Sequence, residues 1–245
     1  MSRTGAFLLD LFFPNRCDCC GARIASDALL CARCLAALDA LRITPAEWLS
    51  GHAGEDFPWD GVFTVFSYKA EARAGILAMK DGAQSFGRYA GALLAEAVRA
   101  EIAPEEIDRV TWVPVSAARR RRQGYAHAEL LGKTAAKALG RPADGSLLTE
   151  SDSRLRQHQL KREERAVFGT RFQHTGTDLS GQTVLLVDDV LTTGSTMRRC
   201  TELLRESGAA RVFAASAACR VRNAKGGAYE HQTDQAGDGA QGEGA

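Results

Sequence analysis

Two adjacent carboxylates followed by a run of hydroxyl residues mark the segment of this sequence that is richest in chemistry. Four apolar residues, 184–187, lead directly into Asp188 and Asp189. An apolar run of this kind is typical of a buried parallel strand, and open α/β sheets bind their ligands at the carboxyl ends of such strands. We therefore expect both acids to lie at a ligand site.

The residues that follow the acids favour an anion. Gly194 permits a sharp bend, and its neighbours can point N–H and O–H groups into one concavity at the start of a helix, whose positive end attracts phosphate. The lysine and glycine frame of a P-loop is missing, so this is a different kind of cradle. The predicted phosphate cradle consists of Val190, Leu191, Thr192, Thr193, Gly194, Ser195 and Thr196.

Two acids beside a phosphate cradle would repel a polyanion, so they must meet a neutral or cationic part of the ligand. Vicinal ribose hydroxyls suit that role. Residues 184–196 resemble the loop of the type I phosphoribosyltransferases that binds phosphoribosyl pyrophosphate (PRPP). The resemblance implies that Asp188 and Asp189 are the catalytic pair that holds the ribose hydroxyls, and that the cradle holds the 5′-phosphate.

The cysteines suggest a metal site near the amino terminus. Five of the seven lie between positions 17 and 34, in two pairs of CxxC spacing. Two such pairs can aim four thiolates at one tetrahedral zinc ion, and a set of four leaves no position open for catalysis. Cys19 is a fifth thiol that could replace a neighbour, and a redox role or plain burial are the alternatives. The predicted structural zinc ligands are Cys17, Cys20, Cys31 and Cys34.

Taken together, these features resemble the ComF/GntX family of phosphoribosyltransferase-like proteins. The resemblance covers residues 1 to about 220. It is carried by the four-cysteine module, the 184–196 motif and several shorter matches in the same order, namely Tyr68, Arg73 and Lys80, Val113-Pro114-Val115, Arg122-Gln123-Gly124-Tyr125, and Arg154, Gln159 and Arg165. The family implies a type I phosphoribosyltransferase-like parallel sheet flanked by helices, with a small zinc module before it.

The resemblance also implies residues that grip pyrophosphate. The candidates are Lys80 and, in the loop after the strand at 109–113, Ser116, Arg119 and Arg122. The arginines of this run could instead be solvated at a helix start.

The chain departs from the family pattern at positions near these predicted pyrophosphate-binding residues. Gln123 and Ala126 stand where an arginine and an asparagine are usual, and Phe168 replaces an asparagine. His127 and His158 lie near the expected site, but the five histidines show no metal-ligand spacing.

Composition and the positions of Pro and Gly residues divide the chain into four expected parts. Residues 1–45 form a module too small to bury a core without its metal. The turn-forming residues Pro45, Gly51, Gly54 and Pro58 predict a linker over 46–60. Residues 61–222 alternate strand-like and helix-like segments. Residues 223–245 hold almost no large apolar groups, which predicts a disordered tail. Residues 150–172 predict a long charged loop that would close over the site.

The charge balance and the apolar runs exclude some functions. The net charge is +1, so no overall field attracts nucleic acid, and no apolar run is long enough to span a bilayer. We find no signal peptide and expect a cytoplasmic protein without membrane insertion.

Three functions remain, all resting on the resemblance. The first is transfer of the phosphoribosyl group from PRPP, bound with Mg²⁺, to an unknown acceptor with release of pyrophosphate. The second is a PRPP- or nucleotide-binding accessory factor for DNA uptake in natural competence, with single-stranded DNA or competence proteins as partners. The third is nucleobase salvage.

Overall fold

The structure is a computed structural model, which describes residues 15–52, 54–123, 126–151 and 171–221. The expected tail, most of the 150–172 loop, and Gly124, Tyr125 and Phe168 lie outside these ranges. No described helix has both the length and the apolar character needed to cross a membrane.

A parallel four-stranded sheet forms the centre of the protein. Its strands lie in the order β1-β6-β5-β2, and every neighbouring pair is parallel. A separate antiparallel pair joins β3 to β4. The bounds are β1 Gly61–Ser67, β2 Arg109–Trp112, β3 Leu148–Glu150, β4 Phe172–His174, β5 Thr183–Leu191 and β6 Arg211–Cys219.

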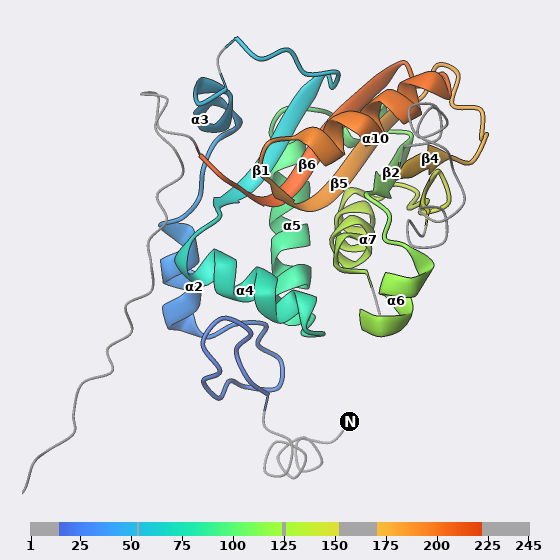
Figure 1. The fold of residues 1–245 in the computed structure, drawn as a ribbon. Coiled ribbons are helices and arrows are strands. Elements are labelled where there is room, and N and C mark those ends of the chain that lie inside the picture. Colours follow the sequence, from blue (N-terminus) through green and yellow to red (C-terminus); the bar gives the residue numbers. More distant parts are fainter. Residues whose placement is uncertain (1–14, 53, 124–125, 152–170, 222–245) are drawn as a thin grey trace, which may run out of the picture.

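Helices cover both faces of the sheet (Figure 1). Helices α4, α5 and α7 pack on one face, and α10 packs on the other. The described helices are α2 Ala32–Asp39, α3 Pro45–Ser50, α4 Ala70–Lys80, α5 Ser85–Arg99, the 3-10 turn Pro104–Glu106, α6 Ala117–Gln123, α7 His127–Leu139 and α10 Ser195–Glu206. This arrangement confirms the predicted fold class.

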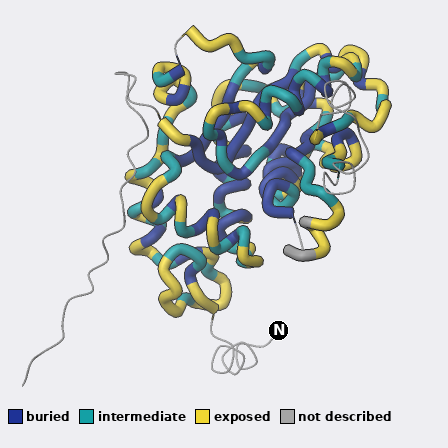
Figure 2. Tube along the Cα trace, viewed as in Figure 1, coloured by how far each residue is buried: buried dark blue, intermediate teal, exposed yellow. Residues whose placement is uncertain are grey.

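Strand β5 divides the core into two clusters because successive side chains of a strand point to opposite faces. Leu185 and Val187 belong to the cluster under α4, α5 and α7, whereas Val184 and Leu186 belong to the cluster under α10. All four side chains are fully buried, and the sheet is the most buried part of the molecule (Figure 2). The alternation determines which way the two acids that follow these residues within β5 point.

Residues 46–60 are more structured than the predicted linker. Helix α3 begins here with a capping box between Thr44 and Glu47, and Trp48 and Trp59 are buried in the α10-side cluster. The Pro and Gly residues interrupt regular structure in the segment, but the two tryptophans pack it against the sheet. The four-part division of the chain stays a prediction.

Candidate functional site

The acid pair lies at the carboxyl end of β5, where the sequence predicts it. Asp188 follows the alternation of Val184 and Leu186 and faces the side of α10. Asp189 follows Leu185 and Val187 and faces the side of α4 and α7. The two adjacent acids therefore lie in different environments, on opposite faces of the sheet.

Asp188 faces the predicted phosphate cradle. It lines a hollow of about 30 Å³ together with residues of the loop and the first turn of α10, namely Val190, Leu191, Thr192, Gly194, Ser195, Thr196 and Met197. The Asp188 carboxylate accepts a hydrogen bond from the Asp189 N–H at 2.8 Å. An acid and a helix start thus share one concavity.

The cradle owes its shape to a left-handed glycine. Gly194 has φ +75° and directly precedes α10. The Ser195 N–H donates to the Thr193 hydroxyl at 3.4 Å, and no side chain caps the helix at Gly194. A Cβ on Gly194 would lie 3.0 Å from the Trp59 ring, so the aromatic residues of the 46–60 segment support the loop from behind.

Asp189 is held by two basic side chains from different helices. Its Oδ2 lies 2.9 Å from Lys80 Nζ, at the end of α4, and 3.4 Å from His127 Nε2, at the start of α7. Its Oδ1 accepts a hydrogen bond from the Val190 N–H at 2.7 Å. The predicted pyrophosphate residue Lys80 is therefore bound to an acid of the pair.

The two acids differ in their tendency to ionise. Burial and the neighbouring Asp189 charge raise the pKa of Asp188 well above its ordinary value. Burial also acts to raise the pKa of Asp189, but the charges of Lys80 and His127 outweigh it and hold the value below the ordinary one. The pKa values of the two acids are therefore shifted in opposite directions, and Asp189 is the more readily ionised of the pair.

The pyrophosphate candidates after β2 are described in part. The Ser116 N–H donates to Glu150 Oε2 at 2.7 Å, and Glu150 also pairs with Arg171. Arg119 and Arg122 lie on α6, but their side chains are outside the described part of the chain. Arg120, in the same run, pairs with Glu129 at 2.7 Å. Glu150, whose side chain is 7% exposed, is a site neighbour that the sequence analysis missed.

The four predicted zinc ligands come together at the amino-terminal end of the described chain. The Sγ atoms of Cys17, Cys20, Cys31 and Cys34 all lie within 4.8 Å of one another. The Cys20 and Cys31 sulfurs are 3.6 Å apart, close to the edge of about 3.8 Å that a tetrahedron with Zn–S bonds of about 2.3 Å requires. A hydrogen bond from the Ala22 backbone is the main cause that lowers the pKa of Cys20 to about 6. This donor set suits zinc.

The alternatives for the cysteines fit the structure less well. Cys19 is outside the group of four, and burial raises the pKa of its thiol to about 12. No disulfide joins any of the seven cysteines, all of which are described. Cys200 and Cys219 are fully buried in the core.

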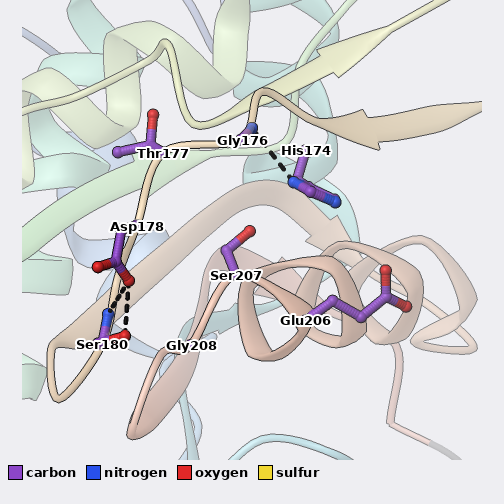
Figure 3. Close-up of a pocket in the computed structure, with 8 residues that line it drawn as sticks. All are labelled: His174, Gly176, Thr177, Asp178, Ser180, Glu206, Ser207 and Gly208. Carbon is purple, nitrogen blue, oxygen red and sulfur yellow. Dashed lines mark hydrogen bonds between the residues drawn. The ribbon is translucent and has the colours of Figure 1, made fainter.

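A larger cavity lies at the opposite edge of the sheet. It holds about 330 Å³ and is lined by residues before β5 and at the end of α10, which are His174, Gly176, Thr177, Asp178, Ser180, Glu206, Ser207 and Gly208 (Figure 3). Asp178 is bonded to Ser180, and Glu206 is paired with Arg199. Its carboxylates thus have partners, and the cavity is separate from the acid pair.

Comparison with known proteins supports the same domain type. A family model described as "Phosphoribosyl transferase domain" matches residues 131–235. The "DNA utilization protein YhgH" of Salmonella typhimurium is 28% identical over 198 residues, which cover 80% of this chain and 80% of that protein. The protein of the same description from Escherichia coli K12 is 26% identical over 201 residues, 80% of this chain and 86% of that one.

Two further similarities are shorter or more distant. The "Ribose-phosphate pyrophosphokinase" of Pyrococcus furiosus is 43% identical over 56 residues, 22% of this chain and 20% of that protein. Among solved structures, the glutamine PRPP amidotransferase of B. subtilis is 25% identical with a TM-score of 0.41, and the match covers 59% of this chain and 27% of that one.

Proposed function

This chain is a ComF-like member of the phosphoribosyltransferase-like proteins, and we propose that it binds PRPP with Mg²⁺ and transfers the phosphoribosyl group to an acceptor, releasing pyrophosphate. The observation that carries the proposal is the junction of β5 with α10. There Asp188 and the loop around Gly194 line one hollow, and Asp189 is held next to it by Lys80 and His127.

Each part of this junction matches one part of PRPP. The hydroxyls and N–H groups from Thr192 to Thr196 would bind the 5′-phosphate at the start of α10. Asp188 and Asp189 would orient the ribose hydroxyls. Ser116, Arg119 and Arg122, in and after the loop that follows β2, would bind pyrophosphate. All these groups come from the carboxyl edge of the sheet, where such folds bind ligands.

The reaction would be a displacement at ribose C1. The acceptor atom forms a bond to C1, the bond from C1 to pyrophosphate breaks, and pyrophosphate leaves with the electron pair through an oxocarbenium-like transition state. Mg²⁺, if it is bound together with PRPP, would spread the charge of the leaving group. The residues assigned above would hold the sugar and the phosphates in line for this step.

A thermal-shift screen tests this function. PRPP, nucleotides and free bases are each added with Mg²⁺, and the unfolding temperature is measured. We expect PRPP to raise it most, by an amount that grows with PRPP concentration, because a ligand that binds only the folded state stabilises it. A shift with a nucleotide or a free base and none with PRPP would contradict the proposal.

A second candidate is a role in DNA uptake, favoured by the DNA utilization proteins among the relatives. In this case the run Arg119–Arg122 would bind single-stranded DNA. Fluorescence anisotropy across a salt series distinguishes the two functions, since the slope of log affinity against log salt is about −0.7 for each phosphate contacted.

We expect Arg119→Ala plus Arg122→Ala to weaken PRPP or pyrophosphate binding. The slope of log DNA affinity against log salt should stay unchanged. Lys133→Ala on α7, an exposed cation paired with Glu129, serves as the charge control. Micromolar DNA binding that is lost in the double variant, with PRPP affinity intact, would favour the DNA role.

A further inference from the structure

His127 is a buried titratable residue that the mechanism above does not use. It is the first residue of α7 and is 6% exposed. Its Nε2 lies 3.4 Å from Asp189 Oδ2, the same oxygen that Lys80 Nζ approaches to 2.9 Å. Two basic groups from separate helices therefore converge on one oxygen of the acid pair.

The elements packed around this imidazole carry the following charged groups among the described residues. Strand β5 presents Asp189, with Asp188 directly before it, and α4 presents Lys80. On its own helix, Glu129 is paired with Arg120 of α6 and with Lys133. The charged residues of α5, which packs beside α7, are Arg88, Glu96 and Arg99, and all three are exposed. The charged residue of β2 is Arg109, which is paired with Asp144. Asp189 is thus the acid that the structure pairs with the imidazole.

We propose that His127 is a positioning residue that orients Asp189 for the ribose hydroxyls, and that its protonation adds a positive charge that strengthens PRPP binding. This inference rests on the proposed function, and it names a source of regulation at the same site.

The physical basis is the titration range of imidazole. Its ordinary pKa is about 6.5, so its charge changes within the physiological range. A neighbouring carboxylate favours the charged form. When His127 and Lys80 are both protonated, they outweigh the charge of Asp189, and a polyanion meets a more positive site. When the imidazole is neutral, this excess is lost and the phosphates are bound less tightly.

The test compares PRPP affinities measured by calorimetry with Mg²⁺ at about pH 6 and at about pH 8, which bracket the imidazole titration. His127→Gln keeps a side chain that can hydrogen-bond to Asp189 but does not titrate. The phosphates of PRPP titrate in the same range, but they do so equally with both proteins. The quantity of interest is therefore the ratio of wild-type to variant association constants at each pH.

We expect this ratio to be larger at the lower pH by about threefold or more, because a unit charge near a partly buried anion site is weakly screened. His174→Gln is the matched control. His174 is an exposed histidine on β4 that lines the separate cavity at the opposite edge of the sheet (Figure 3). Its ratio to wild type is expected to stay the same at both pH values.

Two results would overturn the inference, and they are distinguishable from failure of the proposed function. If the wild type binds PRPP and the His127→Gln ratio is the same at both pH values, His127 does not act in this way and the proposed function stands. If no PRPP binds, the proposed function fails, and an NMR titration of the His127 ring in wild type and in Asp189→Asn decides the charge pairing alone. We expect the titration midpoint to fall in Asp189→Asn, and an unchanged midpoint would refute the pairing.

Discussion

The carboxyl edge of the sheet and the four-cysteine module are built on different principles. The edge is positioned by a core: β5 reaches it through four fully buried side chains, and Trp59 supports the loop at Gly194. The loops of the module, residues 15–31, bury only Cys17 and Leu30 among their side chains, and Figure 2 shows them mostly exposed. One region is fixed by packing, and the other depends on its sulfur atoms.

Among the described residues, a hydrogen bond links the loops of the module to the helices that carry the site. Asp18, inside the first CxxC pair, accepts from the Phe86 N–H at 2.7 Å and so satisfies a donor at the start of α5. Phe86 packs on Gly75 of α4, and α4 ends at Lys80, which holds Asp189. The module therefore supports the site from outside, whereas the core of the sheet forms it.

The largest expected effect is loss of the metal. Cys17→Ser plus Cys34→Ser is expected to abolish a zinc content of one ion per chain and to unfold the module, because structural zinc contributes roughly 10 kcal/mol or more to small domains. Elemental analysis gives the stoichiometry, and hydrogen exchange shows which segments open. The sheet strands should stay protected.

Cys19→Ser is the control for this change, since Cys19 lies outside the group of four. It should retain zinc. Zinc that persists in the double variant, or is lost in Cys19→Ser, would show that a different set of thiols binds the metal.

Gly194→Ala should damage the phosphate cradle. The backbone at φ +75° costs a residue with Cβ about 1–2 kcal/mol, and the new Cβ would also press on Trp59. We expect PRPP affinity to fall by about tenfold or more as the loop shifts. Calorimetry measures the affinity, and thermal unfolding measures the stability.

Gly181→Ala is the control that separates the loss of stability caused by a Cβ at positive φ from the loss of PRPP affinity caused by a distorted phosphate cradle. Gly181 has the same φ of +75°, lies just before β5 at the opposite edge, and has nothing within 4 Å of the added Cβ. Its variant should lose similar backbone stability and keep PRPP affinity. Equal loss of affinity in both variants would mean that the effect is global.

The smallest expected effect is at the link between the two regions. Asp18→Ala removes the acceptor for the Phe86 N–H, and the loss of such a cap costs about 1 kcal/mol, or about 2–4 °C in a chain of this size. Zinc content should not change. Asp27→Ala, in the same module and exposed, is the matched control and should be neutral. A loss of zinc in Asp18→Ala would mean that the contact supports the metal site itself.

Local patterns in the sequence were sufficient to predict the main features. The apolar run before Asp188 predicts a central strand, and the structure has one in β5. The CxxC spacing predicts four converging thiols, and the structure brings them together. Both features depend on residues close in the chain, where spacing alone limits the geometry.

Contacts between distant segments could not be predicted in the same way. Lys80 and His127 meet Asp189 only because α4 and α7 cover the same face of the sheet, and no spacing in one sequence encodes that meeting. The packing of Trp48 and Trp59 was obscured by the Pro and Gly residues around them. Glu150 was missed because a lone carboxylate in a charged segment carries no signal of burial.

The central claim is that the β5–α10 junction binds PRPP through the acid pair, and calorimetry with PRPP and Mg²⁺ tests it most directly. Wild type is compared with Asp188→Asn plus Asp189→Asn. Each charge-assisted bond to a hydroxyl contributes about 1.5–3 kcal/mol, so the double variant should lose about two to four decades of affinity. Unchanged affinity in a folded double variant would show that the acids serve the fold and that PRPP, if bound, binds elsewhere.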